Sequence, residues 1–272
     1  MKMDFLPKSV LKISALTFAI ASTASCTAMA TGTDHQIANA TSSTAITLGN
    51  AATTSGTNDT VAIGSQANAG LNSATAVGGQ ANAAGLGSTS IGWQSKATAE
   101  RAQAFGHLAN ASGVRSTAVG EAAMAGGNND TVAVGNKANA GLNSATAVGG
   151  EANAAGLGST SIGWQSKATA ERAQAFGHLA DASGVRATAV GEAAAAQGAN
   201  SVAVGNKSMA AGMNSIAIGN EAKASKDNQV VLGNAGQVQS STAAQSGTVR
   251  IVTIDDNGTL GTMMVDYYKS AK

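Results

Sequence analysis

Apolar and polar positions repeat along the chain with a fixed period, which a glycine marks at every fourteenth position. One larger apolar residue comes directly before each of these glycines, and a small residue, most often alanine, comes two positions before it. The period is constant except that the steps into Gly64 and Gly135 are one residue longer. The glycines are Gly49, Gly64, Gly78, Gly92, Gly106, Gly120, Gly135, Gly149, Gly163, Gly177, Gly191, Gly205, Gly219 and Gly233. A fixed short period is typical of a solenoid, in which each repeat contacts only its neighbours.

Small residues alternate within each repeat, and a period of two predicts β-strands. Between Gly64 and Gly78, Ala67 and Ala69 alternate in the first half, and Ala74 and Ala76 alternate in the second. Glycine, asparagine and serine separate the two halves and favour turns. Each repeat therefore predicts two short strands and two turns, which form one coil of a flattened parallel β-roll. About 14 coils stacked roughly 4.8 Å apart would make a rod of ~65 Å.

The small residues are expected inside the roll, because two sheets with only alanine, serine and glycine between them can approach closely. The larger apolar residues then point outward as a continuous stripe, which a soluble monomer would not normally expose. We therefore predict self-association through this stripe. An alternative places valine and isoleucine inside. The residues expected at the interface are Ile63, Val77, Ile91, Phe105, Val119, Val134, Val148, Ile162, Phe176, Val190, Val204 and Ile218.

A longer repeat lies over the short one. Residues 57–127 recur almost unchanged as residues 128–198, which is a displacement of five coils. Adding whole coils lengthens a rod without disturbing the contacts between neighbouring coils. The duplication therefore favours a role in reach or in multivalent binding over a role as an enzyme.

The composition suits a rod of thin coils better than a globular domain. Charged residues make up 11% of the chain, aromatic residues 3%, and glycine occurs 34 times. With a net charge of +1 there is no electrostatic case for binding nucleic acid or an anionic membrane surface.

Residues 1–30 read as a signal peptide with an apolar run too short to span a membrane, and with Ala28-Met29-Ala30 as the cleavage site. Lipidation at Cys26 is an alternative. The mature chain would then contain neither cysteine nor proline, which suits an uninterrupted strand ladder.

The repeat resembles the head repeats of YadA-like trimeric autotransporter adhesins. Thr60-Val61-Ala62-Ile63-Gly64, Ser201-Val202-Ala203-Val204-Gly205 and Ser215-Ile216-Ala217-Ile218-Gly219 carry the resemblance, as do Asn82-Ala83-Ala84-Gly85 and Asn110-Ala111-Ser112-Gly113. It covers residues 45 to about 233. It implies an all-β, left-handed parallel β-roll solenoid packed as a homotrimer. It also implies a location at the bacterial surface and binding to host matrix proteins, host cells or other bacteria.

The C-terminal part departs from that family. After Gly233 we find neither heptads nor the barrel strands that anchor such proteins in the outer membrane, so the usual attachment is in doubt. Thr248 to Ile254, a turn at Asp255 to Gly258, and a second strand predict a β-hairpin. For residues 262–272, a short helix and a piece of stalk are both open. The expected organisation is residues 1–30 as signal peptide, 31–43 as lead-in, 44–238 as roll and 239–272 as a neck-like hairpin segment.

Four residues stand out as weak candidates for binding a ligand. His107 and His178 follow their glycines at the same place in coils five apart, so they cannot share a metal ion within one chain. Trp93 and Trp164 occupy that place one coil earlier and could anchor a ligand, although packing in a trimer interface is the simpler interpretation. Asp255 to Gly258 reads better as a hairpin turn than as a calcium loop. No metal and no cofactor is expected.

The leading functional prediction is a non-enzymatic adhesin head that attaches through many weak contacts. A phage or secreted fibre component is an alternative, and so is an ice-binding solenoid. The threonine column that ice binding would need is interrupted, for example by Val61 and Gln103. An enzyme on a solenoid would need a cleft with convergent acids and bases, and no such pattern is found.

Overall fold

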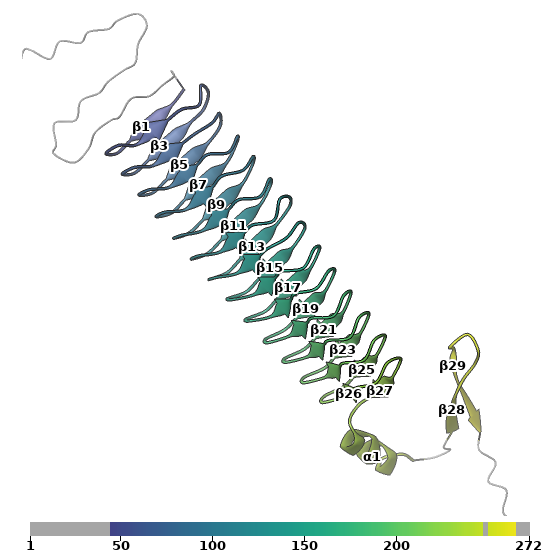
Figure 1. The fold of residues 1–272 in the computed structure, drawn as a ribbon. Helices are drawn as coiled ribbons and strands as arrows, with labels where there is room; N and C mark the ends of the chain where they lie inside the picture. The colour runs from purple at the N-terminus through teal and green to yellow at the C-terminus, as the bar shows by residue number, and fades with distance from the viewer. Residues whose placement is uncertain (1–43, 247–249, 265–272) are drawn as a thin grey trace, which may run out of the picture.

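The computed structural model describes residues 44–246 and 250–264. Most of this chain winds into an elongated β-solenoid, followed by one short helix and a hairpin (Figure 1). The expected signal peptide, Cys26 and the lead-in lie outside the described residues, as do residues 265–272.

Two strands alternate along the solenoid, one of three residues and one of two. The three-residue strands are β1 (Ile46–Leu48), β3 (Val61–Ile63), β5 (Thr75–Val77), β7 (Thr89–Ile91), β9 (Gln103–Phe105), β11 (Thr117–Val119), β13 (Val132–Val134), β15 (Thr146–Val148), β17 (Thr160–Ile162), β19 (Gln174–Phe176), β21 (Thr188–Val190), β23 (Val202–Val204), β25 (Ile216–Ile218) and β27 (Val230–Leu232). The two-residue strands are β2 (Thr53–Thr54), β4 (Asn68–Ala69), β6 (Asn82–Ala83), β8 (Lys96–Ala97), β10 (Asn110–Ala111), β12 (Met124–Ala125), β14 (Asn139–Ala140), β16 (Asn153–Ala154), β18 (Lys167–Ala168), β20 (Asp181–Ala182), β22 (Ala195–Ala196), β24 (Met209–Ala210) and β26 (Lys223–Ala224).

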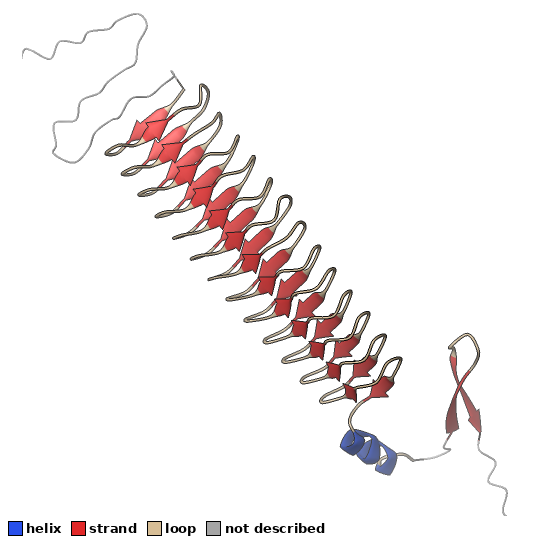
Figure 2. Ribbon diagram, viewed as in Figure 1, coloured by secondary structure: helices blue, strands red, loops and turns tan. Residues whose placement is uncertain are grey.

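The strands form two parallel sheets along the rod (Figure 2). The odd-numbered strands β1 to β27 make a 14-stranded sheet, here the long-strand sheet, and the even-numbered strands β2 to β26 make a 13-stranded sheet. Each residue pairs with the residue one coil later, as Val61 pairs with Thr75 and Asn68 with Asn82. The predicted β-roll is therefore confirmed.

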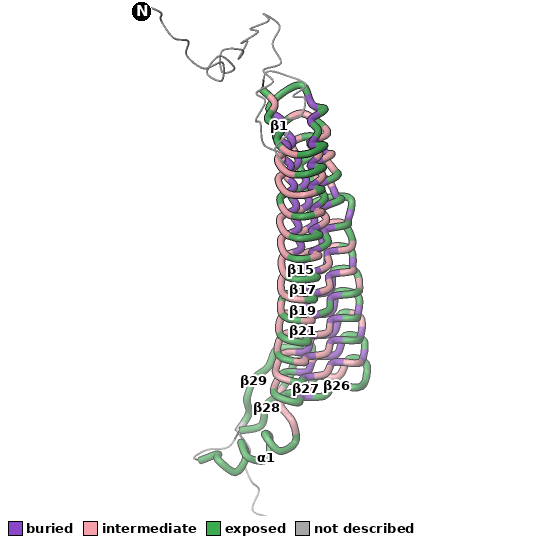
Figure 3. The backbone as a smooth tube through the Cα atoms, turned by 90° about the vertical axis from the view of Figure 1, so that its left-hand side faces the viewer, coloured by how far each residue is buried: buried purple, intermediate pink, exposed green. Residues whose placement is uncertain are grey.

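Alanine fills the space between the two sheets. Ala62 and Ala76 of the long-strand sheet and Ala69 and Ala83 of the other are fully buried. Serine and threonine replace alanine at some inward positions. Ser90 and Ser95, for example, share a hydrogen bond of 2.7 Å between their hydroxyls. Figure 3 shows the buried residues in columns along the inside of the roll and the exposed residues on its outside. The prediction that the small residues lie inside is confirmed.

The larger apolar residues point away from this core. Ile91, Ile162 and Ile218 flank the buried middle residue of their strands and are 38–43% exposed. The alternative that placed valine and isoleucine inside the roll is wrong, because the space between the sheets holds little more than a methyl group.

The glycine that marks each coil is required by close approach of the backbone. At Gly92 φ is +134°, and a Cβ atom there would lie 2.4 Å from the carbonyl oxygen of Gly106 in the next coil. That φ belongs to a region that residues with a side chain essentially do not adopt. The period in the sequence is therefore a stack of glycines, each lying against the next.

The longer coil that ends at Gly135 absorbs its extra residue in one turn. Thr117 pairs with Val132 and Met124 with Asn139, so each strand still meets its counterpart in the next coil and the register is kept on either side. The extra residue lies in the turn between β12 and β13. Asp130 in this turn accepts hydrogen bonds from Nε and Nη2 of Arg115, at 2.7 and 2.9 Å.

A helix that was not predicted from the sequence closes the described end of the roll. Helix α1 (Ala235–Ala243) begins at a capping box, in which Asn234 and Gln237 each bond the other's backbone. This pattern of a capping residue followed three positions later by glutamine is legible in the sequence. The last coil therefore ends at Leu232, before the expected boundary at residue 238. Among the described residues, no helix is both long and apolar enough to cross a membrane.

The hairpin was predicted correctly. Strands β28 (Arg250–Ile254) and β29 (Leu260–Met264) pair antiparallel. Asp255 accepts backbone N–H bonds from Asn257 and Thr259, which hold the pKa of its carboxyl below the ordinary value, with the Thr259 bond contributing most. The carboxylate thus organises the turn. Residues 262–264 belong to β29.

Replacing one glycine of the stack should destabilise the roll. We expect Gly92→Ala to lower the free energy of unfolding by about 3 kcal/mol, because the methyl group meets a backbone oxygen and the φ is unfavourable. Gly126→Ala is the matched control, since only the Ser112 hydroxyl comes within 4 Å of a Cβ there, and it should change stability little. Urea unfolding followed by circular dichroism measures both. Equal stability of the two variants would contradict the close-approach argument.

The Arg115–Asp130 pair should give a small stability contribution that depends on pH. The hydrogen bond from Arg115 lowers the pKa of the Asp130 carboxyl. The contribution is therefore present above the ordinary carboxyl pKa of about 4 and is lost as pH falls through the lowered value. The urea midpoint of Asp130→Asn should lie below that of the parent at pH 7 and match it at about pH 2. Salt should shrink the difference, because both groups are exposed. A difference that persists in acid would show that the ion pair is not its cause.

Candidate functional site

The turn after each marking glycine forms one edge of the rod. Neighbouring coils stay in register along this edge, since Leu108 N–H donates to Trp93 C=O at 3.0 Å and Ala122 N–H donates to His107 C=O at 2.8 Å. The residue directly after each glycine therefore stands beside its counterparts in the coils above and below. Trp93, His107, Trp164 and His178 all occupy this position.

The structure brings each tryptophan together with one histidine. The rings of Trp93 and His107 are stacked with centroids 5.0 Å apart and an interplanar angle of 23°. Trp164 and His178 repeat this arrangement at 5.0 Å and 20°. The sequence places each tryptophan one coil before a histidine at the same position, and the stacking of coils brings the two rings into contact.

A glutamate and an asparagine continue each stack. Nδ1 of His107 lies 3.5 Å from Oε1 of Glu121, and Asn136 donates from Nδ2 to Oε2 of the same carboxylate at 3.2 Å. In the second copy the corresponding distances are 3.6 Å from His178 to Glu192 and 3.1 Å from Asn206 to Glu192. These glutamates and asparagines were not among the predicted site residues, although they stand at the same place after their glycines.

A glycine lies on the open side of each tryptophan. A Cβ atom at Gly79 would lie 3.1 Å from Cδ1 of Trp93, and one at Gly150 would lie 3.0 Å from Cδ1 of Trp164. The position beside each tryptophan in the preceding coil therefore carries no side chain, and a side chain there would have to displace the indole ring. We call the set Gly79, Trp93, His107, Glu121 and Asn136 the Trp93 stack. Its copy, the Trp164 stack, consists of Gly150, Trp164, His178, Glu192 and Asn206.

Polar side chains border the stacks at the next position of the same turn. Gln94 donates from Nε2 to Oε1 of Gln80 at 2.6 Å, and Gln165 donates to Oε2 of Glu151 at 2.7 Å. Both pairs connect neighbouring coils beside a tryptophan, so their positions are fixed relative to the ring.

The opposite turn carries charged residues without a comparable stack. Glu100 and Arg101 approach to 3.8 Å, and Glu171 and Arg172 to 3.7 Å, as exposed neighbours. Contacts of this kind contribute little to stability. They also leave these side chains in solvent.

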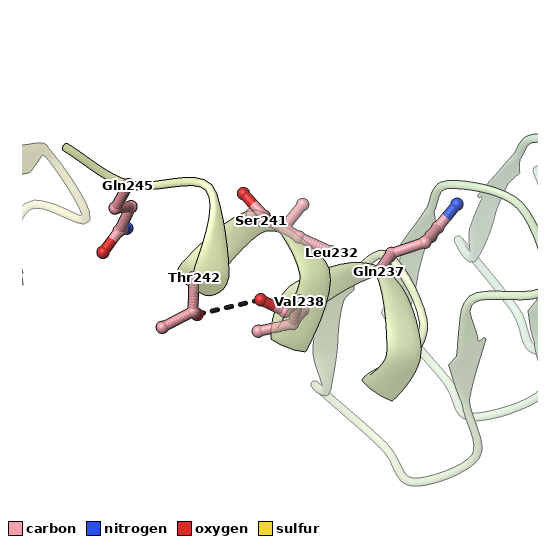
Figure 4. Close-up of a pocket in the computed structure, with 7 residues that line it drawn as sticks. Leu232, Gln237, Val238, Ser241, Thr242 and Gln245 are labelled. Atoms are coloured by element: carbon pink, nitrogen blue, oxygen red, sulfur yellow. Dashed lines mark hydrogen bonds between the residues drawn. The ribbon is translucent and has the colours of Figure 1, made fainter.

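Nothing in the described part of the chain groups three or more histidine, cysteine, aspartate or glutamate residues as a metal site. His107 and His178 lie in separate stacks and face no common ligand. A shallow hollow lies where α1 meets the last coil (Figure 4). It is lined by Leu232, Gly233, Gln237, Val238, Ser241, Thr242 and Gln245, none of which is an acid or a base.

Comparison with known proteins identifies the repeat. The family model of the YadA head domain repeat, which describes two copies of the repeat, matches residues 72–95, 83–109, 97–123, 111–138, 154–180, 182–208 and 210–234. Among solved structures, the collagen-binding domain of the Yersinia adhesin YadA is similar at 21% identity, over 80% of this chain and 93% of that domain, with a TM-score of 0.25. A search of curated proteins found no match.

The family matches cover more than half of the chain and fall on the two-sheet roll. The marking glycine and the outward apolar residue of most coils lie within them. The chain therefore belongs to the YadA head-repeat family and has the fold of an adhesin head.

Proposed function

We propose that this chain is the trimeric, non-enzymatic head of a bacterial surface adhesin, which attaches to host matrix, host cells or other bacteria. The family membership supports an adhesin. The distribution of charged and apolar side chains over the rod supports the trimeric assembly.

The outer face of the long-strand sheet is the observation that carries the proposal. None of its 14 strands contains a lysine, arginine, aspartate or glutamate. Valine, isoleucine, leucine, phenylalanine, threonine and glutamine supply its outward side chains. A face of this length without charge is typical of a surface that is covered in the working protein.

Charged residues gather on the other surfaces of the rod. The two-residue strands carry Lys96, Lys167, Asp181 and Lys223 on their outward side. Both turns carry acids and bases as well. The contrast indicates that one face packs against other chains while three surfaces remain in water, which suits three rods around a common axis.

The hairpin adds a second uncovered apolar region. Ile251 and Met263 pair on one face, and Ile254 and Leu260 pair on the other; all four are exposed. A hairpin alone is marginally stable, and apolar side chains on both faces call for partners. Copies of the hairpin from neighbouring chains would supply them.

Attachment by such a head would work through repetition. A rod presents the same edge positions coil after coil, and three rods triple the number of contacts. Weak contacts that act together can exceed the strength of one contact by about 10²–10⁴-fold.

The oligomeric state tests the assembly. We expect light scattering of the purified protein to give three times the mass of one chain. Replacing Ile91, Ile162 and Ile218, which are 38–43% exposed on the long-strand sheet, by aspartate should give monomers, because charges would enter the contact face.

The matched control places aspartate five positions earlier in the same coils. Leu86, Leu157 and Met213 are 47–48% exposed at the opposite turn, and their replacement should leave the trimer intact. Circular dichroism shows whether both variants keep the roll. A monomeric parent protein, or equal dissociation of the two variants, would contradict an interface on the long-strand sheet.

Attachment is tested with the trimer itself. Binding of the purified protein to immobilised collagen, to cultured epithelial cells and to bacterial cells should be measured beside the monomeric variant. We expect the trimer to bind at least one target about 100-fold more tightly than the monomer. A trimer that binds none of the three would argue against an adhesive role.

A further inference from the structure

Each tryptophan is exposed and yet held in a fixed orientation. Trp93 and Trp164 are each 49% exposed. One side of the ring is stacked on a histidine, and the coil on its other side has a glycine at this position, which carries no side chain to cover the ring. A ring fixed before binding loses little freedom when a ligand arrives, so its apolar surface is available at a low entropic cost.

Hydrogen-bonding groups lie in the same turn and in the neighbouring coils. The Gln80–Gln94 pair lies beside Trp93, and the carboxylate of Glu121 lies beyond His107. No acceptor among the described residues takes the indole N–H of Trp93. The ring is therefore a flat apolar surface with amide groups beside it, a carboxylate one coil beyond the histidine, and a free donor on its own edge.

We propose that the Trp93 and Trp164 stacks bind uncharged sugar rings, and that one glycan chain lying along the rod occupies both. This inference rests on the proposed function, since it names the class of target that an adhesive head would hold at these two places.

The chemistry of the stacks fits a sugar better than it fits other ligands. One face of a pyranose ring presents C–H groups, which pack on the negative face of an aromatic ring. Its hydroxyls point sideways and need amide and carboxyl partners in that plane. Glu121 and Glu192 within the stacks, and Glu151 beside the second, would repel a phosphorylated or sulfated ligand.

The two stacks are placed to act together. Trp93 and Trp164 occupy the same turn five coils apart, or roughly 24 Å along the rod. Both repeat the same stacking on a histidine at 5.0 Å, so the rod carries the same arrangement of residues twice along one edge. A polymer with a repeating chemical unit can use both, whereas a small ligand can use only one at a time.

This edge would stay open in the proposed trimer. Glu121, Lys137, Glu151, Lys207 and Glu221 lie along the same turns. Burying such a row of charges in an interface would be costly, since interface cores are depleted of charged residues. The uncharged long-strand sheet is the face left for assembly.

Tryptophan fluorescence reports on the stacks alone, because the chain contains only these two tryptophans. The parent protein should be titrated with chitin, mannan and glucan oligosaccharides of increasing length, and with heparin and soluble collagen for comparison. We expect a saturable change in emission with at least one uncharged glycan. Chains that reach both rings should bind at least about 10-fold more tightly than short ones.

Variants separate binding by the stacks from a structural role of the rings. Trp164→Ala should abolish the advantage of long chains and leave short chains bound at Trp93, where fluorescence still reports. Trp93→Ala/Trp164→Ala should lose glycan binding measured by calorimetry. The matched control is Leu71→Ala/Leu142→Ala, because these leucines are also 49% exposed and five coils apart but lie at the opposite turn. This control should bind as the parent does.

Several outcomes would overturn the proposal. One is that no uncharged glycan changes the tryptophan emission. The others are that the double tryptophan variant binds glycan as the parent does, or that the leucine control loses as much glycan binding as the double tryptophan variant. A fluorescence response to collagen or heparin alone would assign the stacks to a protein or an anionic partner instead. Light scattering and cell attachment of the same variants keep the two proposals apart. A trimer that attaches to cells without binding glycans refutes only the sugar sites.

Discussion

The close stacking of one glycine on the next holds the roll together. At Gly92 the backbone approaches the carbonyl of Gly106 so closely that no Cβ fits between them. This approach sets the period of the repeat, because every coil must return its glycine to the same place. The alanine interior follows from it. Buried methylene-sized groups contribute about 0.8 kcal/mol each, so a single coil gains too little to fold alone and depends on its neighbours.

The small interior leaves every large side chain on the outside. In an ordinary domain, valine, isoleucine, leucine and tryptophan are needed to fill the core. Here alanine and serine fill it, so the outer positions can vary in each coil without loss of the fold. The surfaces available for assembly and binding are therefore formed by columns of outward residues. Examples are the charge-free sheet, the charged turns and the two tryptophan stacks. In each of them the residue type changes from coil to coil.

The sequence predicted the roll because the constraint is local and repeated. Fourteen glycines in register, with alternating alanines between them, admit few other structures. The hairpin followed from its turn residues in the same way. Helix α1 was missed because a single capping box, Asn234 with Gln237, carries little weight beside a strong strand pattern. For the candidate site, the sequence predicted Trp93, His107, Trp164 and His178 but neither the ring stacking nor the glutamates. These contacts depend on the direction of the side chains, which the spacing of residues along the chain does not give.

By itself, the sequence determined the period, the two strands of each coil and the duplication of five coils, because these depend on the spacing of residue types along the chain. The sequence favoured the small residues on the inward side but left one alternative open, and the tertiary structure decided between the two. The tertiary structure also decided that residues one repeat apart, such as Trp93 and His107, stand in contact. The physical reason is that the pairing of one coil with the next converts a distance along the chain into adjacency in space.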